Sequence, residues 1–306
     1  MTTTPEDFEV TTEDVAGAEQ AAVAVATRKQ VRKEQRQLLL RSPSFIIGAI
    51  IIGFWLLAGI WPELLDRFDP KANVPGVSPR SGPGDGTWWG TDRLGRDVYS
   101  RVVHGARPIL IAAPAATIIA AFFGTLLGLF TGYFRGWVDE VISRILEAIL
   151  SIPAILLAIV IVFTFGATTP VIIGTIGFLF IPAIARTVRA ATLAEAQLDY
   201  VTAAQMRGER SLFIIWREIF PNIIGVVIVE VTVRLGYAIF TLATLAFLGL
   251  SGGNATDPNW GLDVAQNYQQ VVAEVWWPTV FPALAIGTLV IGVNLLADSI
   301  DEALKS

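Results

Sequence analysis

The sequence contains no cysteine and only one histidine, His104, among its 306 residues. The absence of cysteine excludes disulfides, thiolate metal ligands and cysteine nucleophiles, and one histidine leaves no His-rich metal site. Walker-type phosphate loops, paired-histidine zinc motifs and G-x-S-x-G elbows are missing as well. We therefore predict no catalytic residue, no metal site and no cofactor in this chain, so any energy for uphill work must come from another protein.

Charge is also scarce, since 16% of the residues are charged and 53% are hydrophobic. Several apolar runs approach twenty residues, the length that spans a bilayer as a helix. The composition predicts an all-α integral membrane protein with one membrane domain over residues 41–306. Residues 1–40 form an acidic and then basic tail that we expect to be largely disordered and cytosolic.

Six spans are predicted, at residues 44–61, 108–134, 144–165, 170–190, 222–250 and 278–298. An even number of crossings returns the C-terminus to the cytosol. The positive-inside rule agrees for the tail and for the predicted inner loops. The loop 62–107 is the exception, because it carries seven basic residues on the predicted outside, and we expect a loop of this length to be translocated despite its charge. The segments 62–107 and 251–277 then become extracytoplasmic loops, and 191–221 becomes a cytosolic loop.

Glycine recurs every fourth residue in the second predicted span. Gly124, Gly128, Gly132 and Gly136 therefore share one helical face, along which another helix can approach closely. The partner helix belongs either to this chain, which we favour, or to a second membrane subunit.

Charged residues inside the predicted spans are few. Glu230 and Arg234 lie four residues apart in the fifth span, so they share a face and can form an ion pair. This pair is interpreted either as part of a translocation path or as a structural pair at a subunit interface. Near the start of the third span, Arg144 and Glu147 are expected to pair with each other.

A polar segment, residues 200–222, separates the fourth and fifth spans. Its pattern predicts a short helix, a break at Gly208, and a second amphipathic helix that stops at Pro221. A polar helical hairpin joined to two spans suits the docking of a soluble partner and the transmission of its motion.

These motifs resemble the DppC/OppC-type permease subunits of bacterial dipeptide and oligopeptide ABC importers. Residues 200–222 resemble the EAA loop of those permeases, and Gly90-Thr-Asp-Arg-Leu-Gly-Arg-Asp97 resembles their G-T-D-x-L-G-R-D signature. Further matches are Leu150-Ser-Ile-Pro153, Phe247-Leu-Gly-Leu250 and Asn259-Trp-Gly261. The resemblance extends from about residue 40 to the end and implies a six-helix, MetI-like permease fold of the type I importers, with cytosolic coupling helices.

The resemblance also implies partners. They are a second, DppB/OppB-like permease, two ATPase subunits of the DppD/DppF or OppD/OppF kind that bind ATP and Mg²⁺, and an extracytoplasmic peptide-binding protein. Membrane lipid is a further partner, and nucleic acid is not expected. The chain would be a non-catalytic permease subunit in the bacterial cytoplasmic membrane. The ATPase-coupling residues implied are Tyr200, Ala203, Ala204, Arg207, Gly208, Arg210 and Pro221.

The signature before the second span admits two interpretations. It is a turn and helix start with Asp92 as the N-cap, or it braces the outer gate and touches the binding protein. The residues concerned are Asp92, Arg93, Arg96, Asp97 and, in the last outer loop, Trp260. Two positions depart from the family pattern: Thr202 replaces the usual EAA glutamate, and Leu242 replaces an acid of the fifth span. The cargo alternatives are a nickel chelate or another small solute, and the alternative class is a non-transporting scaffold.

Overall fold

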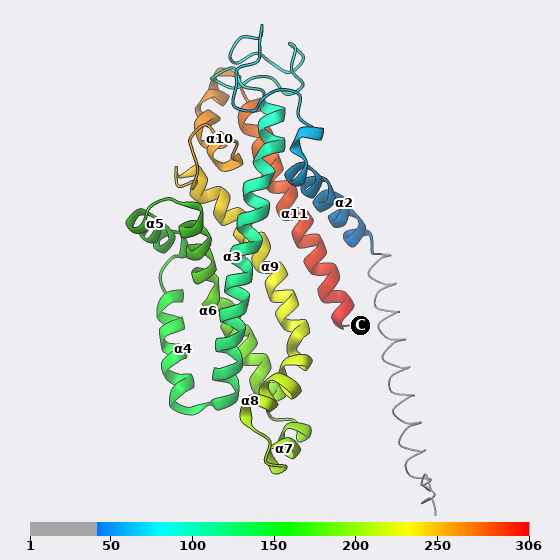
Figure 1. Cartoon of the computed structure of the whole chain (residues 1–306), viewed down its shortest axis with the longest axis vertical. Coiled ribbons are helices and arrows are strands. Elements are labelled where there is room, and N and C mark those ends of the chain that lie inside the picture. Colours follow the sequence, from blue (N-terminus) through cyan, green and yellow to red (C-terminus); the bar gives the residue numbers. More distant parts are fainter. Residues whose placement is uncertain (1–41, 306) are drawn as a thin grey trace, which may run out of the picture.

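The structure is a computed structural model that describes residues 42–305, and the predicted 1–40 tail lies outside that range (Figure 1). Within it the fold is all-α, as predicted. The long helices are α2 (Pro43–Ile60), α3 (Val98–Phe134), α4 (Gly136–Leu150), α5 (Ala154–Phe165), α6 (Thr169–Glu195), α9 (Phe220–Phe247) and α11 (Trp277–Lys305). The short ones are η1 (Pro62–Leu64), α7 (Asp199–Met206), α8 (Ser211–Phe213), η2 (Ile214–Ile219), α10 (Trp260–Asn267) and η3 (Tyr268–Ala273).

Five helices within residues 42–305 are long and apolar enough to cross a membrane, and a sixth span exists if α4 and α5 are counted together. Those two helices bend by 88° at their junction, so the predicted span over 144–165 consists of two helices and not of one continuous helix. Pro153 explains the break, because proline has no N–H to donate and disfavours helical geometry in the preceding residue. The chain also enters α4 earlier than predicted, at Gly136.

The helix α3 begins ten residues before the predicted second span. Asp97 caps it, since its Oδ2 accepts a hydrogen bond of 2.8 Å from the Ser100 backbone N–H. At 37 residues α3 is about 55 Å long, well beyond the roughly 30 Å of a bilayer's hydrocarbon core. Residues 98–107, predicted as loop, are therefore helix, and Val98, Val102, Val103 and Ala106 belong to the main apolar core.

The glycine stripe packs α3 against α6 within this chain. A Cβ built on Gly124 would lie 2.7 Å from Cβ of Ile184, and one on Gly128 would lie 2.6 Å from Cβ of Val188. A Cβ built on Gly132 would be crowded by Thr192 in the same way. Gly136 does not belong to this contact, because it has φ +70° and open space around it. Close approach within the subunit is thus the role of the first three glycines.

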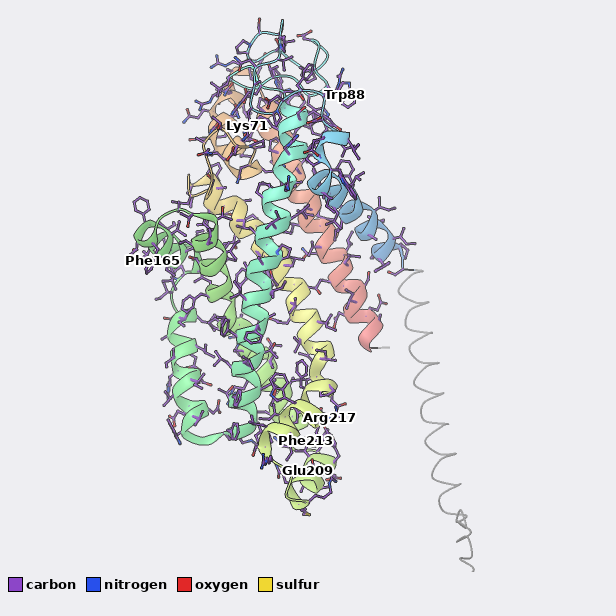
Figure 2. The ribbon with its side chains drawn as sticks, viewed as in Figure 1. Lys71, Trp88, Phe165, Glu209, Phe213 and Arg217 are labelled. Atoms are coloured by element: carbon purple, nitrogen blue, oxygen red, sulfur yellow. The ribbon has the colours of Figure 1, made fainter. Side chains whose placement is uncertain are left out.

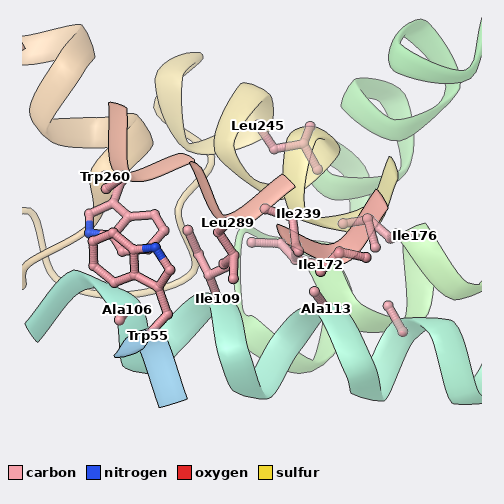
Figure 3. Close-up of a cluster of buried hydrophobic side chains, with 14 of the residues drawn as sticks. Trp55, Ala106, Ile109, Ala113, Ile172, Ile176, Ile239, Leu245, Trp260 and Leu289 are labelled. Atoms are coloured by element: carbon pink, nitrogen blue, oxygen red, sulfur yellow. The ribbon is translucent and has the colours of Figure 1, made fainter. Parts of the chain in front are cut away.

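Two regions cap the bundle at opposite ends (Figure 1). The loop 61–97 packs with α10 at one end, here called the α10 end, and α7 and α8 project at the other, the α7 end. The main apolar core joins α2, α3, α6, α9, α10 and α11, and Figure 3 shows its centre. A second, smaller core lies toward the α7 end and includes Ile184, Val188, Val201, Ala204 and Ile215.

Candidate functional site: the hairpin and the ionic cap

The hairpin comprises residues 199–222 at the α7 end. Its turn follows α7 at Gly208, whose φ of +74° is readily available to glycine, as predicted for a break at this position. The second helix does not stop at Pro221, and that prediction is wrong: the chain stays helical from Ser211 to Phe247. The six-residue π-helix η2 precedes the proline, and its wider turn relieves the crowding that a proline ring imposes on the carbonyl four residues earlier.

A small apolar interior holds the two arms of the hairpin together. Val201 and Ala204 of α7 are fully buried, as are Ile215 and Ile219 of η2. Ala203 is exposed. The two alanines predicted to act together therefore have different surroundings: Ala204 packs the hairpin and Ala203 remains on its surface.

Tyr200 joins the hairpin to both membrane helices that flank it. Its hydroxyl donates to Glu195 Oε1 at 2.6 Å, at the end of α6, and accepts from Asn222 Nδ2 at 2.9 Å, at the start of α9. Burial, followed by the hydrogen bond to the Glu195 carboxylate, raises the pKa of Tyr200 to about 12. The phenol is therefore neutral at physiological pH and acts as a fixed bridge.

The outer surface of the hairpin mixes apolar and basic side chains (Figure 2). Met206 is 83% exposed, and Leu212, Phe213 and Trp216 are exposed as well. Arg207 forms an ion pair of 2.7 Å with Glu209, while Arg210 and Arg217 are exposed. Exposed apolar groups rimmed by charge are typical of a surface that binds another protein.

Glu230 and Arg234 form an ion pair inside α9, with 2.6 Å between Arg234 Nη2 and Glu230 Oε1. Their side chains are 14% and 21% exposed, so the pair is half-buried against the bundle. Arg234 also stacks over the ring of Tyr237 at 5.4 Å. The pairing agrees with the sequence spacing, and its role stays a prediction.

A cluster of buried charged residues closes the α10 end and is here called the ionic cap. Its members are Asp92, Arg96, Asp97, Arg101 and Asp263. Asp92 and Arg96 form a salt bridge of 2.6 Å with side chains 2% exposed. Asp92 Oδ1 also accepts hydrogen bonds from the backbone N–H groups of Leu94 and Arg96. Asp92 is thus the organiser of a turn, and the prediction that it is a helix N-cap is wrong because Asp97 has that position. Arg93 is exposed on this turn.

Arg101 is the centre of the cap and was not among the predicted site residues. Its Nε donates to Asp263 Oδ1 at 3.0 Å, and its other nitrogens donate to the carbonyls of Pro70, Thr256 and Asp257. One guanidinium thereby joins α3, α10 and two loops. Burial raises the pKa of the Asp263 carboxyl, against the opposing effect of Arg101. No local spacing pairs Arg101 with Asp263, because the two residues are 162 positions apart in the sequence.

Trp260 is fully buried in this cap. Its Nε1 donates to the Val102 carbonyl at 2.7 Å, and its ring packs edge-on against Trp55 at 4.7 Å (Figure 3). Gly105 makes room for it, because a Cβ there would lie 2.5 Å from the indole. Direct contact of Trp260 with an external protein is therefore excluded in this conformation, and a bracing role at the gate stays a prediction.

No group of three or more His, Cys, Asp or Glu side chains within residues 42–305 is placed to hold a metal ion. The molecule combines apolar spans, a projecting hairpin with an exposed apolar surface, and a rigid cap at the far end. These features define a multi-pass helical membrane protein of the permease class.

Comparison with known proteins identifies the family. Residues 124–306 match the model of the binding-protein-dependent transport system inner membrane components, and the chain belongs to that family. It is 35% identical to the dipeptide transport system permease protein DppC of Alkalihalophilus pseudofirmus, over 89% of this chain and 88% of the relative.

It is also 33% identical to the glutathione transport system permease protein GsiD of Pectobacterium atrosepticum, over 93% and 95% of the two chains. The probable D,D-dipeptide transport system permease protein DdpC of Escherichia coli is 34% identical over 92% and 94%. The resemblance to DppC/OppC-type permeases is thereby confirmed.

Proposed function

We propose that this chain is one of two permease subunits of an ATP-driven importer of short peptides in the bacterial cytoplasmic membrane. The relatives' names support the cargo, because dipeptides, D,D-dipeptides and glutathione are all short peptides. The observation that carries the proposal is the hairpin, a polar two-armed element fixed to two membrane helices and exposing apolar side chains at its tip.

The α7 end faces the cytosol in this proposal. Basic side chains are exposed there on several elements, at Arg135, Arg186, Arg207, Arg210 and Arg217, and positive charge is enriched on the cytosolic side of membrane proteins. The start of α2 and the end of α11 both point away from the α10 end (Figure 1). Both termini are therefore assigned to the cytosol, and the α10 end to the outside.

The hairpin is the element through which two ATPase subunits, which bind ATP and Mg²⁺, move the permease. Ala203, Arg207 and Arg210 lie on its accessible surface, whereas Ala204 and Tyr200 maintain its shape. Because Tyr200 bridges Glu195 of α6 and Asn222 of α9, a force on α7 reaches both helices. The chain itself contributes binding and motion and no catalytic group.

At the outer end, the ionic cap supports the surface that receives a peptide-binding protein. Asp92, Arg96 and Asp97 are buried, so they position the turn, and the exposed Arg93 is the member available for contact. Loaded binding protein and ATP must favour the same conformation for transport to be coupled. A second, DppB/OppB-like permease completes the translocation path.

Gly208→Pro tests the coupling role, because proline cannot adopt the φ of +74° found there. We expect the complex with the second permease and the ATPases to assemble less well or to lose peptide-stimulated ATP hydrolysis by at least tenfold. Gly208→Asn is the matched control, since asparagine tolerates left-handed backbone. Normal assembly and stimulation in Gly208→Pro would overturn the proposal.

The cargo is tested separately, by ATP hydrolysis of the reconstituted transporter with its loaded binding protein. Stimulation by dipeptides or glutathione is expected. Stimulation by a nickel chelate alone would reassign the cargo, and no stimulation with any solute would favour a scaffold.

The Glu230–Arg234 pair is proposed to border the translocation path. Glu230→Gln/Arg234→Gln keeps side-chain size and removes both charges, so we expect altered uptake in a transporter that still assembles. Failure to assemble would instead assign the pair to a structural interface.

A further inference from the structure

The helix α4 presents different chemistry on its different faces. One face packs toward the bundle: Val138, Ile142, Leu146 and Ile149 line an apolar groove of about 540 Å³ with side chains of α3 and α6. The lining residues of α6 are Phe178, Ile181 and Pro182, which are central in that 27-residue span. The α4 helix therefore lies at membrane depth along α3 and α6 and not flat on the membrane surface (Figure 1).

Glu140, Arg144 and Glu147 form a charged stripe on α4. Spacings of four and three residues place them on one face. Glu147 lies nine residues after Val138, or two and a half turns at 3.6 residues per turn, so the stripe points away from the groove. The side chains of Glu140 and Arg144 are 72% and 75% exposed, with 3.9 Å between Glu140 Oε1 and Arg144 Nη2. The expected Arg144–Glu147 pairing is thus replaced by Arg144–Glu140.

The two flanks of α4, between the groove face and the stripe face, carry either an ion pair with α6 or apolar side chains. On one flank, Asp139 forms an ion pair with Arg189 of α6, at 2.6 Å between Oδ2 and Nη2. On the other flank, Trp137 and Val141 are exposed apolar side chains that suit lipid or an apolar helix. Only the stripe face carries exposed charge.

Exposed charge at this depth is incompatible with lipid contact. A charged side chain at the centre of a membrane helix costs about 2.5–3.5 kcal/mol on insertion scales. Glu147 lies deepest of the three, about 16 Å along α4 from its start at Gly136, so this cost applies most fully to it. Such residues face water or protein. The exposed side chain of Ser151, just after α4, continues the polar face to the 88° bend, where the α4–α5 span is interrupted. Interrupted spans of transporters commonly line the cargo route.

We propose that the charged stripe of α4 lines the aqueous translocation path that this chain forms with the second permease. This assignment rests on the proposed importer function and adds the face and residues through which the chain meets the cargo. The groove behind the stripe stays dry, and the Trp137 flank faces lipid.

The absence of native cysteine makes a labelling test direct. Single-cysteine variants Glu140→Cys, Arg144→Cys and Glu147→Cys are placed in the assembled, reconstituted transporter and treated with a charged, water-soluble thiol reagent. Mass spectrometry of this chain measures the rate at each position. Val141→Cys is the matched control, because Val141 is 48% exposed on the same helix but on the apolar flank, and Ile142→Cys reports on the groove.

We expect the stripe positions to react at least tenfold faster than Val141→Cys and Ile142→Cys. Equal rates at all positions would overturn the proposal. Slow stripe labelling together with cysteine cross-linking to the second permease would also overturn it, in favour of a dry polar interface. If the charge-removing variants assemble poorly, Ser151→Cys tests the same face with a nearly isosteric change. Labelling needs no cargo, so a wrong peptide assignment would leave this result intact.

Discussion

The ionic cap and the hairpin lie at opposite ends of the same helices and are built in opposite ways. The cap buries its charges: Arg96 and Arg101 are each 2% exposed, and Arg101 alone joins four segments of the chain. The hairpin buries a few aliphatic side chains and exposes its three arginines together with the apolar side chains at its tip. One end is internally complete, whereas the other displays groups that suit a partner.

This difference separates rigidity from coupling. A buried guanidinium with a full set of acceptors fixes geometry, because removing one member leaves the others buried and unpaired. A hairpin held by a small core and one tyrosine bridge is fixed to α6 and α9, and under the proposed function it moves together with them. The comparison predicts that substitutions in the cap lower stability and that substitutions in the hairpin lower coupling.

The largest effect is expected for Arg101→Met. It leaves Asp263 and three carbonyls without their shared donor, and breaking a buried pair in this way costs about 3–5 kcal/mol. The thermal midpoint of the purified transporter should fall sharply. Burial raises the pKa of Asp263, and removal of Arg101 raises it further. The carboxyl of the variant is therefore protonated more readily in mild acid, so the loss of stability should be smaller at pH 5.5 than at pH 8. An unchanged midpoint would show that the cap is not held by this residue.

An intermediate effect is expected for Tyr200→Phe, which removes the hydroxyl bridging Glu195 and Asn222. The cost is about 1 kcal/mol and local to the hairpin. Peptide-stimulated ATP hydrolysis should fall relative to basal hydrolysis, with little change in the global thermal midpoint. A large global loss of stability would contradict the separation of the two ends.

The same residue gives a pH prediction. The pKa of Tyr200 is raised from 10 to about 12, so the contribution of the bridge is complete below pH 10 and is lost as the pH rises through 12. Protease cleavage within the hairpin should therefore be constant between pH 6 and 9 and increase only in strong alkali. Tyr200→Phe should abolish that alkaline step.

A smaller effect is expected for Lys71→Met at the edge of the cap. Lys71 and Asp257 are 2.7 Å apart, with side chains 56% and 36% exposed, and exposed pairs typically contribute about 0.2–1 kcal/mol. Lys71 lowers the pKa of Asp257, so this contribution is present at neutral pH and is lost in acid. A loss of stability as large as that of Arg101→Met would show that the exposure of an ion pair does not govern how much it stabilises the cap.

The smallest effect on stability is expected for Met206→Ser, at a side chain that is 83% exposed. The thermal midpoint of the isolated permease pair should change by no more than the equivalent of about 0.5 kcal/mol. Binding of the ATPases should nevertheless weaken measurably in a pull-down titration. Unchanged binding would remove this side chain from the docking surface.

Much of the fold was readable from the sequence because its signals are local. Apolar length predicted the spans, the residue type predicted the break at Gly208, and the four-residue glycine spacing predicted a close helix contact. The spacing of Glu230 and Arg234 likewise predicted their ion pair. The sequence also supported the family assignment, since the motifs lie in a specific order along most of the chain.

The errors arose where tertiary context decides a local choice. Pro153 breaks a span and Pro221 does not, because a π-helical segment accommodates the second proline. Asp92 and Asp97 both precede a helix, and only the folded loop shows which one caps it.

Sequence alone thus determined a multi-pass helical permease with a projecting polar hairpin, because hydrophobic length, glycine spacing and motif order are properties of the chain itself. Only the tertiary structure decided that α6 is the partner of the glycine stripe, that Trp260 is buried, and that Arg101 is the centre of the cap. These facts depend on contacts between residues far apart in the sequence, such as Arg101 with Asp263, 162 positions away. No local pattern fixes such pairings, because they form only when the packed helices bring distant segments together.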